Sequence, residues 1–333
     1  MQQMLVYDAS QVSEARRLTA HACRKWGLDE TNLAQAELVV TEFATNLIKH
    51  AGGGILVIDI NQGRNGIDLT ILSLDKGPGI GNPNEALHDG YTTTGSPGTG
   101  LGAIRRLSGL FDTYSVPGKG TALLSIMRFK KTGDAYLDYH YSAGAVCLPL
   151  TGEKACGDNW AVEQLKDRTV VLAVDGLGHG SLAAEAGHEA VKSFKQNVMH
   201  SLPEIMGLID RALQSTRGAA AAVAEIIPGS QIVRYCGIGN ISGRIVSAKE
   251  ERKLITFNGT LGMGAGKIRE FTYPWSENSL LIMHSDGLTA RWHAENYPGL
   301  WLKHPVLVAG VLYRDHNRPK DDSVVVVVRG GNN

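Results

Sequence analysis

The sequence predicts an α+β protein of two domains. Its 333 residues exceed the usual size of one hydrophobic core, and 43% apolar with 20% charged residues is ordinary for a globular chain. Long helical patterns precede β-branched runs in the first part, whereas many strand-like runs surround two helical patterns in the second. The pattern breaks at residues 130–134. We therefore expect a first domain over residues 1–130, a linker over 131–135 and a second domain over 136–333.

The charge and cysteine content exclude several classes of protein. Lys plus Arg and Asp plus Glu both number 33, so no net positive charge is present to hold nucleic acid or an anionic membrane. The four cysteines are scattered without a CxxC pair, which favours reduced thiols. No apolar run reaches about 18 residues, and no basic segment followed by an apolar run opens the chain. We expect a cytoplasmic protein that binds neither nucleic acid nor membrane.

Apolar residues spaced by three or four positions predict two helices at the start of the first domain, over residues 12–26 and about 30–50. Ser10 is expected to precede the first helix as its cap. On the first helix the expected apolar face consists of Val12, Ala15, Leu18, Ala22 and Trp26. On the second it consists of Ala36, Val40, Phe43 and Leu47.

Two pairs of β-branched runs follow in the first domain, each around a turn. Residues 55–60 and 67–74 predict one hairpin, and residues 111–116 and 121–129 predict another. Helices packed on one face of a mostly antiparallel sheet give an α/β sandwich.

In the second domain, strand-like runs predict paired sheets that are flanked by helices. The runs lie at residues 139–148, 160–165, 169–174, 220–227, 231–237, 242–247, 279–284 and 323–329. Helical patterns lie at residues 181–198, 203–215 and 306–313. The last strand contains five consecutive valines, which is typical of a strand buried on both faces.

The second predicted helix carries a polar stripe. Glu42, Asn46 and His50 are spaced by four residues, so they lie on one side of the helix beside its apolar face. One amide oxygen together with phosphate oxygens suits Mg²⁺, and a carboxylate one turn earlier can deprotonate an attacking hydroxyl. Taken alone, such a stripe is more often a solvated helix face.

A glycine-rich stretch runs from Asp75 to Gly102 and opens onto a helix. Glycine lets the backbone approach a ligand closely, and a glycine-rich turn before a helix presents free N–H groups to phosphate. Asp75 is an acceptor for an amino group such as that of adenine. The stretch fits neither a P-loop nor a dinucleotide fingerprint, because Gly118-Lys119 lacks a following Ser or Thr and Asp75 precedes the glycines.

Four ordered motifs resemble those of the GHKL (Bergerat-fold) ATPases over about residues 1–130: Glu42-x-x-x-Asn46-x-x-x-His50, Asp75-x-Gly77-x-Gly79-Ile80, Gly98-x-Gly100-Leu101-Gly102 and Gly118-Lys119-Gly120-Thr121. With the short loop at residues 89–95, they are most similar to the RsbT/RsbW-type serine protein kinases. The resemblance implies a GHKL α/β sandwich in which Glu42 is the catalytic carboxylate, Asn46 binds Mg²⁺ and Asp75 reads the adenine of ATP. The cofactor-binding residues that it implies are Asn46, His50, Asp75, Gly77, Gly79, Ile80, Thr93, Thr94, Gly98, Thr99, Gly100, Leu101, Gly102 and Thr121.

The second domain offers carboxylates at strand ends. Asp175 and Asp286 each follow an apolar strand, Asp321 and Asp322 precede the last strand, and Asp158 lies in a Gly-Asp turn. Converging carboxylates without interleaved Cys or His ligands suit Mg²⁺ or Mn²⁺ rather than zinc. Two such ions can activate a bridging water for attack on a phosphoryl group. Because a single Asp-Gly is most often a turn, the hypothesis depends on the whole set.

This set resembles the SpoIIE/RsbX branch of the PP2C-type (PPM) serine/threonine phosphatases over about residues 135–330, through Asp175-Gly-Leu-Gly-His-Gly, Gly237-Ile238-Gly239-Asn240, Ser285-Asp286-Gly287 and Asp321-Asp322-Ser323. The resemblance implies an α-β-β-α sandwich that binds two Mn²⁺ or Mg²⁺ ions, with Asp175 and Asp286 as catalytic residues. The metal ligands that it implies are Asp158, Asp175, the Gly176 carbonyl, Asp286 and Asp321. Asp322 is a weaker candidate, oriented toward a bound water. His179 is either a general acid or a residue that fixes the start of the next helix.

Together the motifs predict a bifunctional signalling enzyme. The first domain would phosphorylate a Ser or Thr of a STAS-type anti-sigma-factor antagonist from MgATP, and the second would remove that phosphate. A sigma factor or a downstream switch phosphatase as a further partner, and a homodimer, stay open. The alternative is an ATP-binding, anti-sigma-like module without kinase activity that controls a catalytic phosphatase. Glu42→Ala separates the two hypotheses, because it removes the catalytic carboxylate and leaves the nucleotide-binding residues in place.

Overall fold

The computed structural model describes residues 1–63, 66–81, 100–130, 141–247 and 250–330. The chain divides into two compact units, Met1–Asp138 and Tyr139–Asn333. Both units combine helices with antiparallel sheets, so the predicted α+β class is confirmed. The linker expected at 131–135 lies outside the described residues. Among those described, no helix is both long and apolar enough to cross a membrane.

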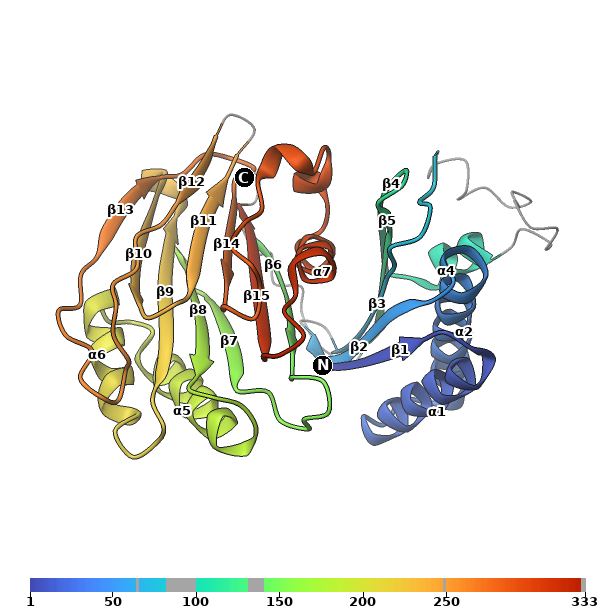
Figure 1. The fold of residues 1–333 in the computed structure, drawn as a ribbon, viewed down its shortest axis with the longest axis horizontal. Helices are drawn as coiled ribbons and strands as arrows, with labels where there is room; N and C mark the ends of the chain where they lie inside the picture. The colour runs from blue at the N-terminus through green and yellow to red at the C-terminus, as the bar shows by residue number, and fades with distance from the viewer. Residues whose placement is uncertain (64–65, 82–99, 131–140, 248–249, 331–333) are drawn as a thin grey trace. The chain divides into compact units, whose positions relative to one another are not determined.

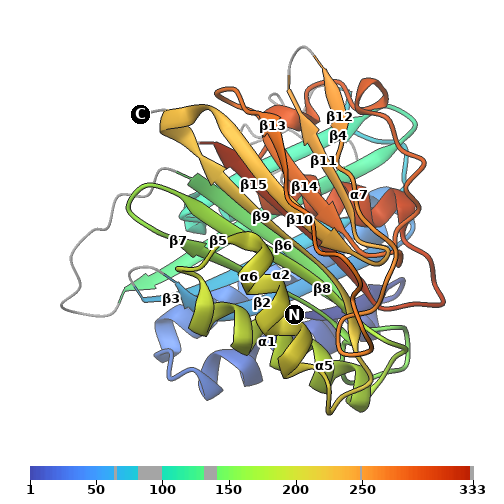
Figure 2. The ribbon, with the colours of Figure 1, turned by 90° about the vertical axis from the view of Figure 1, so that its left-hand side faces the viewer.

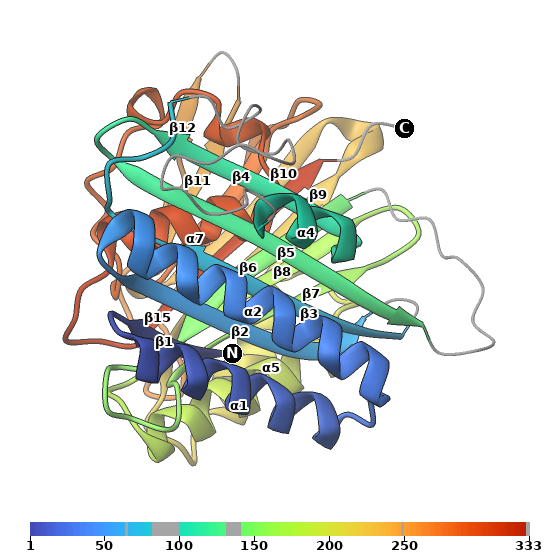
Figure 3. The same ribbon diagram turned by 90° about the vertical axis from the view of Figure 1, so that its right-hand side faces the viewer.

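The N-terminal unit is one five-stranded antiparallel sheet with helices on one face (Figures 1 and 3). The sheet has the order β1-β2-β3-β5-β4. Its strands are β1 (Gln2–Val6), β2 (Gly54–Gly63), β3 (Gly66–Leu74), β4 (Leu110–Val116) and β5 (Gly120–Lys130). Its described helices are α1 (Ala9–Lys25), α2 (Glu30–Ala51) and α4 (Gly100–Leu107). Both predicted hairpins form, and β1 is an additional edge strand.

Helix α1 differs from its prediction in its cap and in its buried face. Asp8, not Ser10, is the N-cap, and it forms a capping box with Gln11. Leu18 is 39% exposed, and the buried residues are Ala15, Thr19, Ala20 and Cys23. The helix therefore presents a smaller, partly polar face to the sheet than the apolar spacing predicted.

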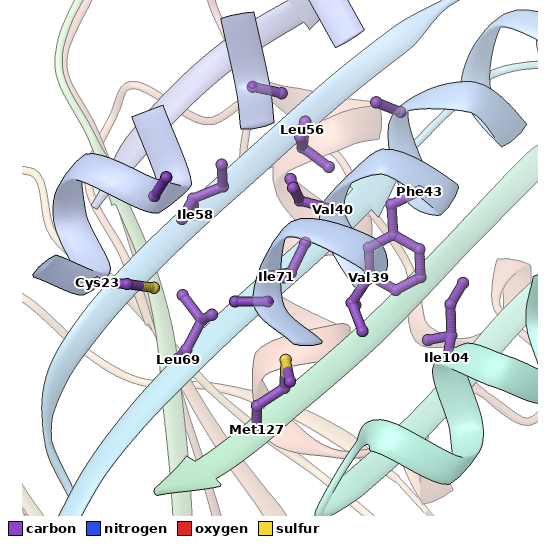
Figure 4. Close-up of a cluster of buried hydrophobic side chains, with 14 of the residues drawn as sticks. Cys23, Val39, Val40, Phe43, Leu56, Ile58, Leu69, Ile71, Ile104 and Met127 are labelled. Carbon is purple, nitrogen blue, oxygen red and sulfur yellow. The ribbon is translucent and has the colours of Figure 1, made fainter. Parts of the chain in front are cut away.

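Helix α2 provides the centre of the N-terminal core. All four residues of its predicted apolar face are buried, and Val39 joins them. Figure 4 shows Phe43 and Val39 directed toward Ile104 of α4, with Ile71 of β3 beneath the helix. Because α2 lies across the sheet, its polar stripe is held in a fixed place relative to the ends of β3 and β5.

The C-terminal unit contains two five-stranded antiparallel sheets, β13-β10-β9-β8-β7 and β12-β11-β14-β15-β6. The strands of the first sheet are β7 (Asp158–Gln164), β8 (Thr169–Gly176), β9 (Ala219–Ile227), β10 (Ile232–Ile238) and β13 (Phe271–Pro274). The strands of the second are β6 (Tyr141–Leu148), β11 (Ser242–Val246), β12 (Glu251–Lys253), β14 (Leu280–His284) and β15 (Ser323–Gly330). The helices are α5 (Ser181–Asn197), α6 (Leu202–Ala212) and α7 (Pro305–His316).

These elements form four layers. Helices α5 and α6 cover the outer face of the first sheet (Figure 2), and α7 packs on β6 and β15 of the second. A shared core fills the space between the sheets, where Val171, Tyr235, Met283 and Val326 are almost fully buried. The five valines of β15 are all buried, as predicted for a strand covered on both faces. The α-β-β-α sandwich is therefore confirmed.

Candidate functional sites in the two units

The polar stripe of α2 forms as predicted. Glu42 and Asn46 are half-buried and His50 is exposed, all on one side of a continuous helix. A Cβ built on Gly100, the first residue of α4, would lie 2.6 Å from Glu42 Oε2. The carboxylate therefore lies against the N-terminus of α4, where N–H groups and the helix dipole favour a negative group. Tertiary packing thus places Glu42 beside Gly100, the first described residue of the third predicted motif.

Asp75 is fixed between two loops at the end of β3. Its Oδ1 accepts hydrogen bonds from the amides of Gly77 (2.8 Å) and Thr121 (3.0 Å), and its own amide donates to the Thr121 carbonyl (2.9 Å). The motif at residues 75–80 is therefore joined to the one at residues 118–121. This arrangement brings two of the four predicted motifs to one end of the sheet.

The glycines of these loops allow the loops to pack against each other. Gly79 has φ +74°, and a Cβ there would lie 2.4 Å from the Val116 carbonyl oxygen. Gly120 has φ +89°, and a Cβ there would lie 2.0 Å from the Asp75 carbonyl oxygen. Any side chain at either position would push the loops apart. The glycines therefore allow the loops of two predicted nucleotide motifs to lie directly against each other.

Sequence reasoning missed Ser115 of β4. Its hydroxyl accepts a 2.7 Å hydrogen bond from the Ile80 amide and lies 2.9 Å from the Thr121 hydroxyl. Ser115 thus holds Ile80 beside the Thr121 loop. A lone serine inside a strand gives no sequence signal for such a role. Four predicted nucleotide contacts lie outside the described residues: Thr93, Thr94, Gly98 and Thr99.

A second group of polar side chains lies at the ends of strands in the C-terminal unit. Asp158 of β7 pairs directly with Asp175 of β8, which places the two carboxylates side by side. Asp158 is 3% exposed, and its Oδ2 accepts a 2.5 Å hydrogen bond from the Ser285 hydroxyl. Asp175 Oδ2 accepts one of 3.3 Å from the Asn240 amide group. Both sheets therefore contribute residues to one edge of the sandwich, at the strand ends that carry Asp158 and Asp175, and we call it the candidate metal edge.

The carboxylates at this edge influence one another's ionisation. Burial, together with the nearby carboxylates of Asp286 and Asp321, raises the pKa of Asp175 to about 7. Burial and then the charge of Asp175 raise the pKa of Asp158. Burial and then Asp286 raise the pKa of Asp321. The structure thus pairs Asp158 with Asp175, and Asp286 and Asp321 lie near enough for their charges to act on Asp175, whose chain neighbour is Gly176.

This donor set suits a hard cation. It consists of carboxylate and carbonyl oxygens. Burial and then mutual repulsion raise the pKa values of these carboxylates, and a bound cation offsets both effects. Within the described part of the chain, however, no three His, Cys, Asp or Glu side chains are gathered closely enough to enclose a metal ion. The carboxylates are therefore near neighbours without forming a closed coordination shell. Assignment of ligands to individual residues stays a prediction.

Asp322 has a different place from the one expected. Its Oδ1 accepts a 2.6 Å hydrogen bond from the Leu150 amide and its Oδ2 one of 2.7 Å from the Gly157 amide. The residue is 2% exposed. Both oxygens are thus bonded to backbone between β6 and β7, which gives Asp322 a structural part in holding the segment before Asp158.

His179 lies in the loop that follows Asp175 and Gly176. Its Nδ1 is 3.0 Å from Glu153 Oε1, and its side chain is 56% exposed. The next residue, Gly180, is the N-cap of α5 and makes no side-chain cap. His179 is therefore held by Glu153 and does not cap the helix. Glu153 was not identified from the sequence, where no pattern links it to His179.

The comparisons with known proteins assign a different family to each unit. Residues 5–126 match the family model described as "Histidine kinase-like ATPase domain", and residues 166–329 match "Stage II sporulation protein E (SpoIIE)". Serine/threonine-protein kinase RsbT of Bacillus subtilis is 32% identical over 112 residues, which cover 34% of this chain and 84% of RsbT. Phosphoserine phosphatase RsbX of the same organism is 28% identical over 145 residues, which cover 42% of this chain and 71% of RsbX.

Among solved structures, a chain described as "The bacterial stressosome: a modular system that has been adapted to control secondary messenger signaling" is 27% identical, with a TM-score of 0.53. The match covers 57% of this chain and 99% of that one.

Proposed function

We propose that the chain both adds phosphate to protein Ser or Thr residues and removes it. The proposal proceeds from its families: the N-terminal domain belongs to the histidine kinase-like ATPase family of RsbT, and the C-terminal domain belongs to the SpoIIE family of PP2C-type phosphatases. The proposed substrate is a STAS-type anti-sigma-factor antagonist of a partner-switching pathway. One observation supports the phosphatase activity most strongly. Asp158 of β7 pairs directly with Asp175 of β8, and Ser285 and Asn240 donate hydrogen bonds to these two carboxylates, so strand ends of both sheets meet at one acidic edge.

In the C-terminal domain, the residues that would hold two Mn²⁺ or Mg²⁺ ions are Asp158, Asp175, the Gly176 carbonyl, Asp286 and Asp321. Bound ions of this kind supply an activated water and neutralise charge on the phosphoryl group. The chain itself supplies the alignment: Ser285 orients Asp158, and Asn240 orients Asp175. Because burial and the nearby carboxylates raise the pKa of Asp175 to about 7, a cation that binds there near neutral pH would displace a proton from this carboxyl group.

In the N-terminal domain, Asn46 would hold Mg²⁺, the glycine motifs would surround the phosphates of ATP, and Asp75 would accept a hydrogen bond from the adenine amino group. Glu42 would accept the proton of the attacking Ser or Thr hydroxyl. The position of the Glu42 carboxylate beside Gly100 supports this role, because residues 98–102 form the predicted phosphate motif. We therefore propose that phosphotransfer takes place where the Glu42 carboxylate lies beside Gly100.

The second candidate function is an ATP-binding module without phosphotransfer that regulates the phosphatase. It is favoured by the same cradle, because the glycines and Asp75 account for nucleotide binding without any use of Glu42. In that case ATP would act as a ligand of the N-terminal domain.

The test uses the full chain with labelled ATP and a STAS protein from the same operon. Asp175→Asn should let phosphorylated partner accumulate, whereas Glu42→Gln should release phosphate from pre-phosphorylated partner with Mn²⁺ but add it only at a residual rate. Glu37→Gln on the same helix and Asp167→Asn in an exposed turn are matched controls that should behave as the unsubstituted protein.

Absence of transfer by Asp175→Asn, with nucleotide binding intact, would favour the ATP-binding module. Absence of both transfer and release would reject the proposed function.

A further inference from the structure

An exposed arginine lies over the loop that follows Asp175. A Cβ built on Gly178 would lie 3.2 Å from Arg217 Nη1, so the guanidinium passes directly above this glycine. Gly178 has φ +90°, a conformation that disfavours a side chain. Within the described residues, the Arg217 side chain makes no hydrogen bond or ion pair. The cation is therefore available to a ligand.

The position of Arg217 is set by the strand pair that carries the candidate metal edge. Gly176 of β8 pairs with Ala219 of β9, and the Leu177 amide donates a 3.0 Å hydrogen bond to the Gly218 carbonyl. Arg217 therefore lies immediately beyond the ladder that ends in Asp175 and Gly176. The ladder therefore fixes where the backbone of Arg217 lies relative to Asp175 and Gly176.

Two exposed apolar side chains flank Arg217. Leu177 is 46% exposed and Met263 is 63% exposed. A Cβ built on Gly218 would lie 3.5 Å from Met263 Cγ, and the Leu261 amide bonds to the Ala219 carbonyl at 2.9 Å. Leu177 and Met263 thus both lie beside Gly218, the residue that follows Arg217, and we call Leu177, Arg217 and Met263 the rim.

We propose that the rim binds the phosphorylated segment of the protein substrate, with Arg217 on the phosphoryl group and Leu177 and Met263 on apolar residues beside the phosphoserine or phosphothreonine. The inference rests on the proposed phosphatase function and adds to it the group that recognises the substrate. Arginine pairs with phosphate through two parallel hydrogen bonds, which makes it suited to this position.

The charges at this edge give the reason for such a cation. Asp158, Asp175, Asp286 and Asp321 are acidic, and two divalent cations offset four ionised carboxylates without any excess positive charge. A phosphorylated side chain brings roughly −1.5 to −2 further charges at neutral pH. Arg217 supplies positive charge from outside the carboxylate group. Because Arg217 is exposed beside apolar side chains, a ligand there excludes water and strengthens the ion pair.

The experiment compares two substrates of the full-length protein in Mn²⁺: para-nitrophenyl phosphate, which offers a phosphoryl group on a small ring, and a phosphoserine peptide with apolar residues beside the phosphoserine. Arg217→Ala should raise KM for both by about tenfold or more, with kcat within about threefold. It should weaken inhibition by inorganic phosphate by a similar factor. Arg217→Lys should restore part of the affinity, because it keeps the charge without the fork.

The flanking residues are tested by the double variant Leu177→Ser with Met263→Ser, which should raise KM for the peptide and leave KM for para-nitrophenyl phosphate unchanged. Arg211→Ala, an exposed arginine of α6, is the matched control and should change neither. Thermal unfolding of each variant in EDTA checks that the fold is kept.

If the unsubstituted enzyme hydrolyses both substrates and Arg217→Ala leaves KM and phosphate inhibition unchanged, the proposed role of the rim in substrate binding is wrong. Failure of the unsubstituted enzyme to hydrolyse either one would instead overturn the phosphatase function itself.

Discussion

Asp322 Oδ2 accepts a 2.7 Å hydrogen bond from the amide of Gly157, and this contact joins the two sheets of the C-terminal domain. Asp322 directly precedes β15 of one sheet, and Gly157 directly precedes β7 of the other. Gly157 is followed by Asp158, and Asp322 is preceded by Asp321. The hydrogen bond therefore sets the separation of two predicted metal ligands that come from opposite sheets.

Asp322→Asn is expected to destabilise the metal-free protein by about 1–3 kcal/mol, because an amide nitrogen cannot accept the backbone hydrogen bond that a carboxylate oxygen accepts. Urea unfolding in EDTA measures this change. Asp321→Asn is the matched control, and it should leave metal-free stability equal or higher because it removes a charge that faces Asp286. If Asp322→Asn kept metal-free stability and lost only Mn²⁺ affinity, Asp322 would be a ligand and not a structural tie.

Ser285→Ala is expected to weaken Mn²⁺ binding and to lower stability by about 1–3 kcal/mol. The Ser285 hydroxyl donates to Asp158 Oδ2 at 2.5 Å and accepts from the Val324 amide at 3.1 Å, so its loss leaves two buried groups without this partner. Calorimetric titration with Mn²⁺ and urea unfolding give the two readouts. Ser215→Ala, at an exposed position, should change neither. Equal Mn²⁺ affinity in Ser285→Ala would contradict an orienting role for the hydroxyl.

The contribution of Asp175 to metal-free stability is expected to fall as pH rises from about 4 to about 7. The pKa of Asp175 is raised to about 7 by burial and by Asp286 and Asp321, so the folded state keeps a proton there that the unfolded state has already lost. The raised pKa values of Asp158 and Asp321 act in the same direction. Mn²⁺ should reverse the trend, because metal binding requires the ionised carboxylates.

Urea unfolding at several pH values, with EDTA or with Mn²⁺, measures this dependence. Asp175→Asn should flatten the metal-free curve, and Asp167→Asn in an exposed turn should not. An equal pH dependence in EDTA for Asp175→Asn and the unsubstituted protein would show that the folded state does not hold a proton on Asp175.

Regular spacing explains which elements could be predicted from the sequence. Helix α2 and strand β15 have long apolar patterns, and both form close to the expected bounds. Strands β12 and β13 have only three and four residues, too few for a pattern, and each lies at the edge of a sheet that holds it. The α1 cap at Asp8 was missed even though Gln11 follows at the capping-box distance.

The candidate sites could be predicted only in part. Asp175 and Asp286 were found because each follows an apolar strand, which is a local property. The hydrogen bonds of Ser285 to Asp158 and of Asp322 to Gly157 join residues 127 and 165 positions apart, so no local pattern indicates them. The same holds for the contact of Glu42 with Gly100, which depends on how α4 packs against α2.

Gly120→Ala is expected to cost at least about 2 kcal/mol of stability and to abolish nucleotide binding. Its φ of +89° disfavours alanine, and the added Cβ would lie 2.0 Å from the Asp75 carbonyl oxygen. Gly118→Ala is a close control: it has φ +76°, with nothing within 4 Å of the added Cβ, so it should lose only about 1–2 kcal/mol. Thermal unfolding and titration with a fluorescent ATP analogue compare the two. Equal losses would indicate that strain, and not the contact with Asp75, decides the effect.

Gly100→Ala is expected to reduce phosphotransfer through Glu42 alone. Gly100 has no left-handed φ, so alanine suits its backbone, but the new methyl group would lie 2.6 Å from Glu42 Oε2 and displace the carboxylate. Gly81→Ala, where nothing lies within 4 Å of the added Cβ, is the control. Because the effect depends on one contact, a double-mutant cycle isolates it. The phosphotransfer rate should fall by about tenfold or more in Gly100→Ala and by no further factor when Glu42→Gln is already present, whereas additive losses would mean that Gly100 acts on ATP directly.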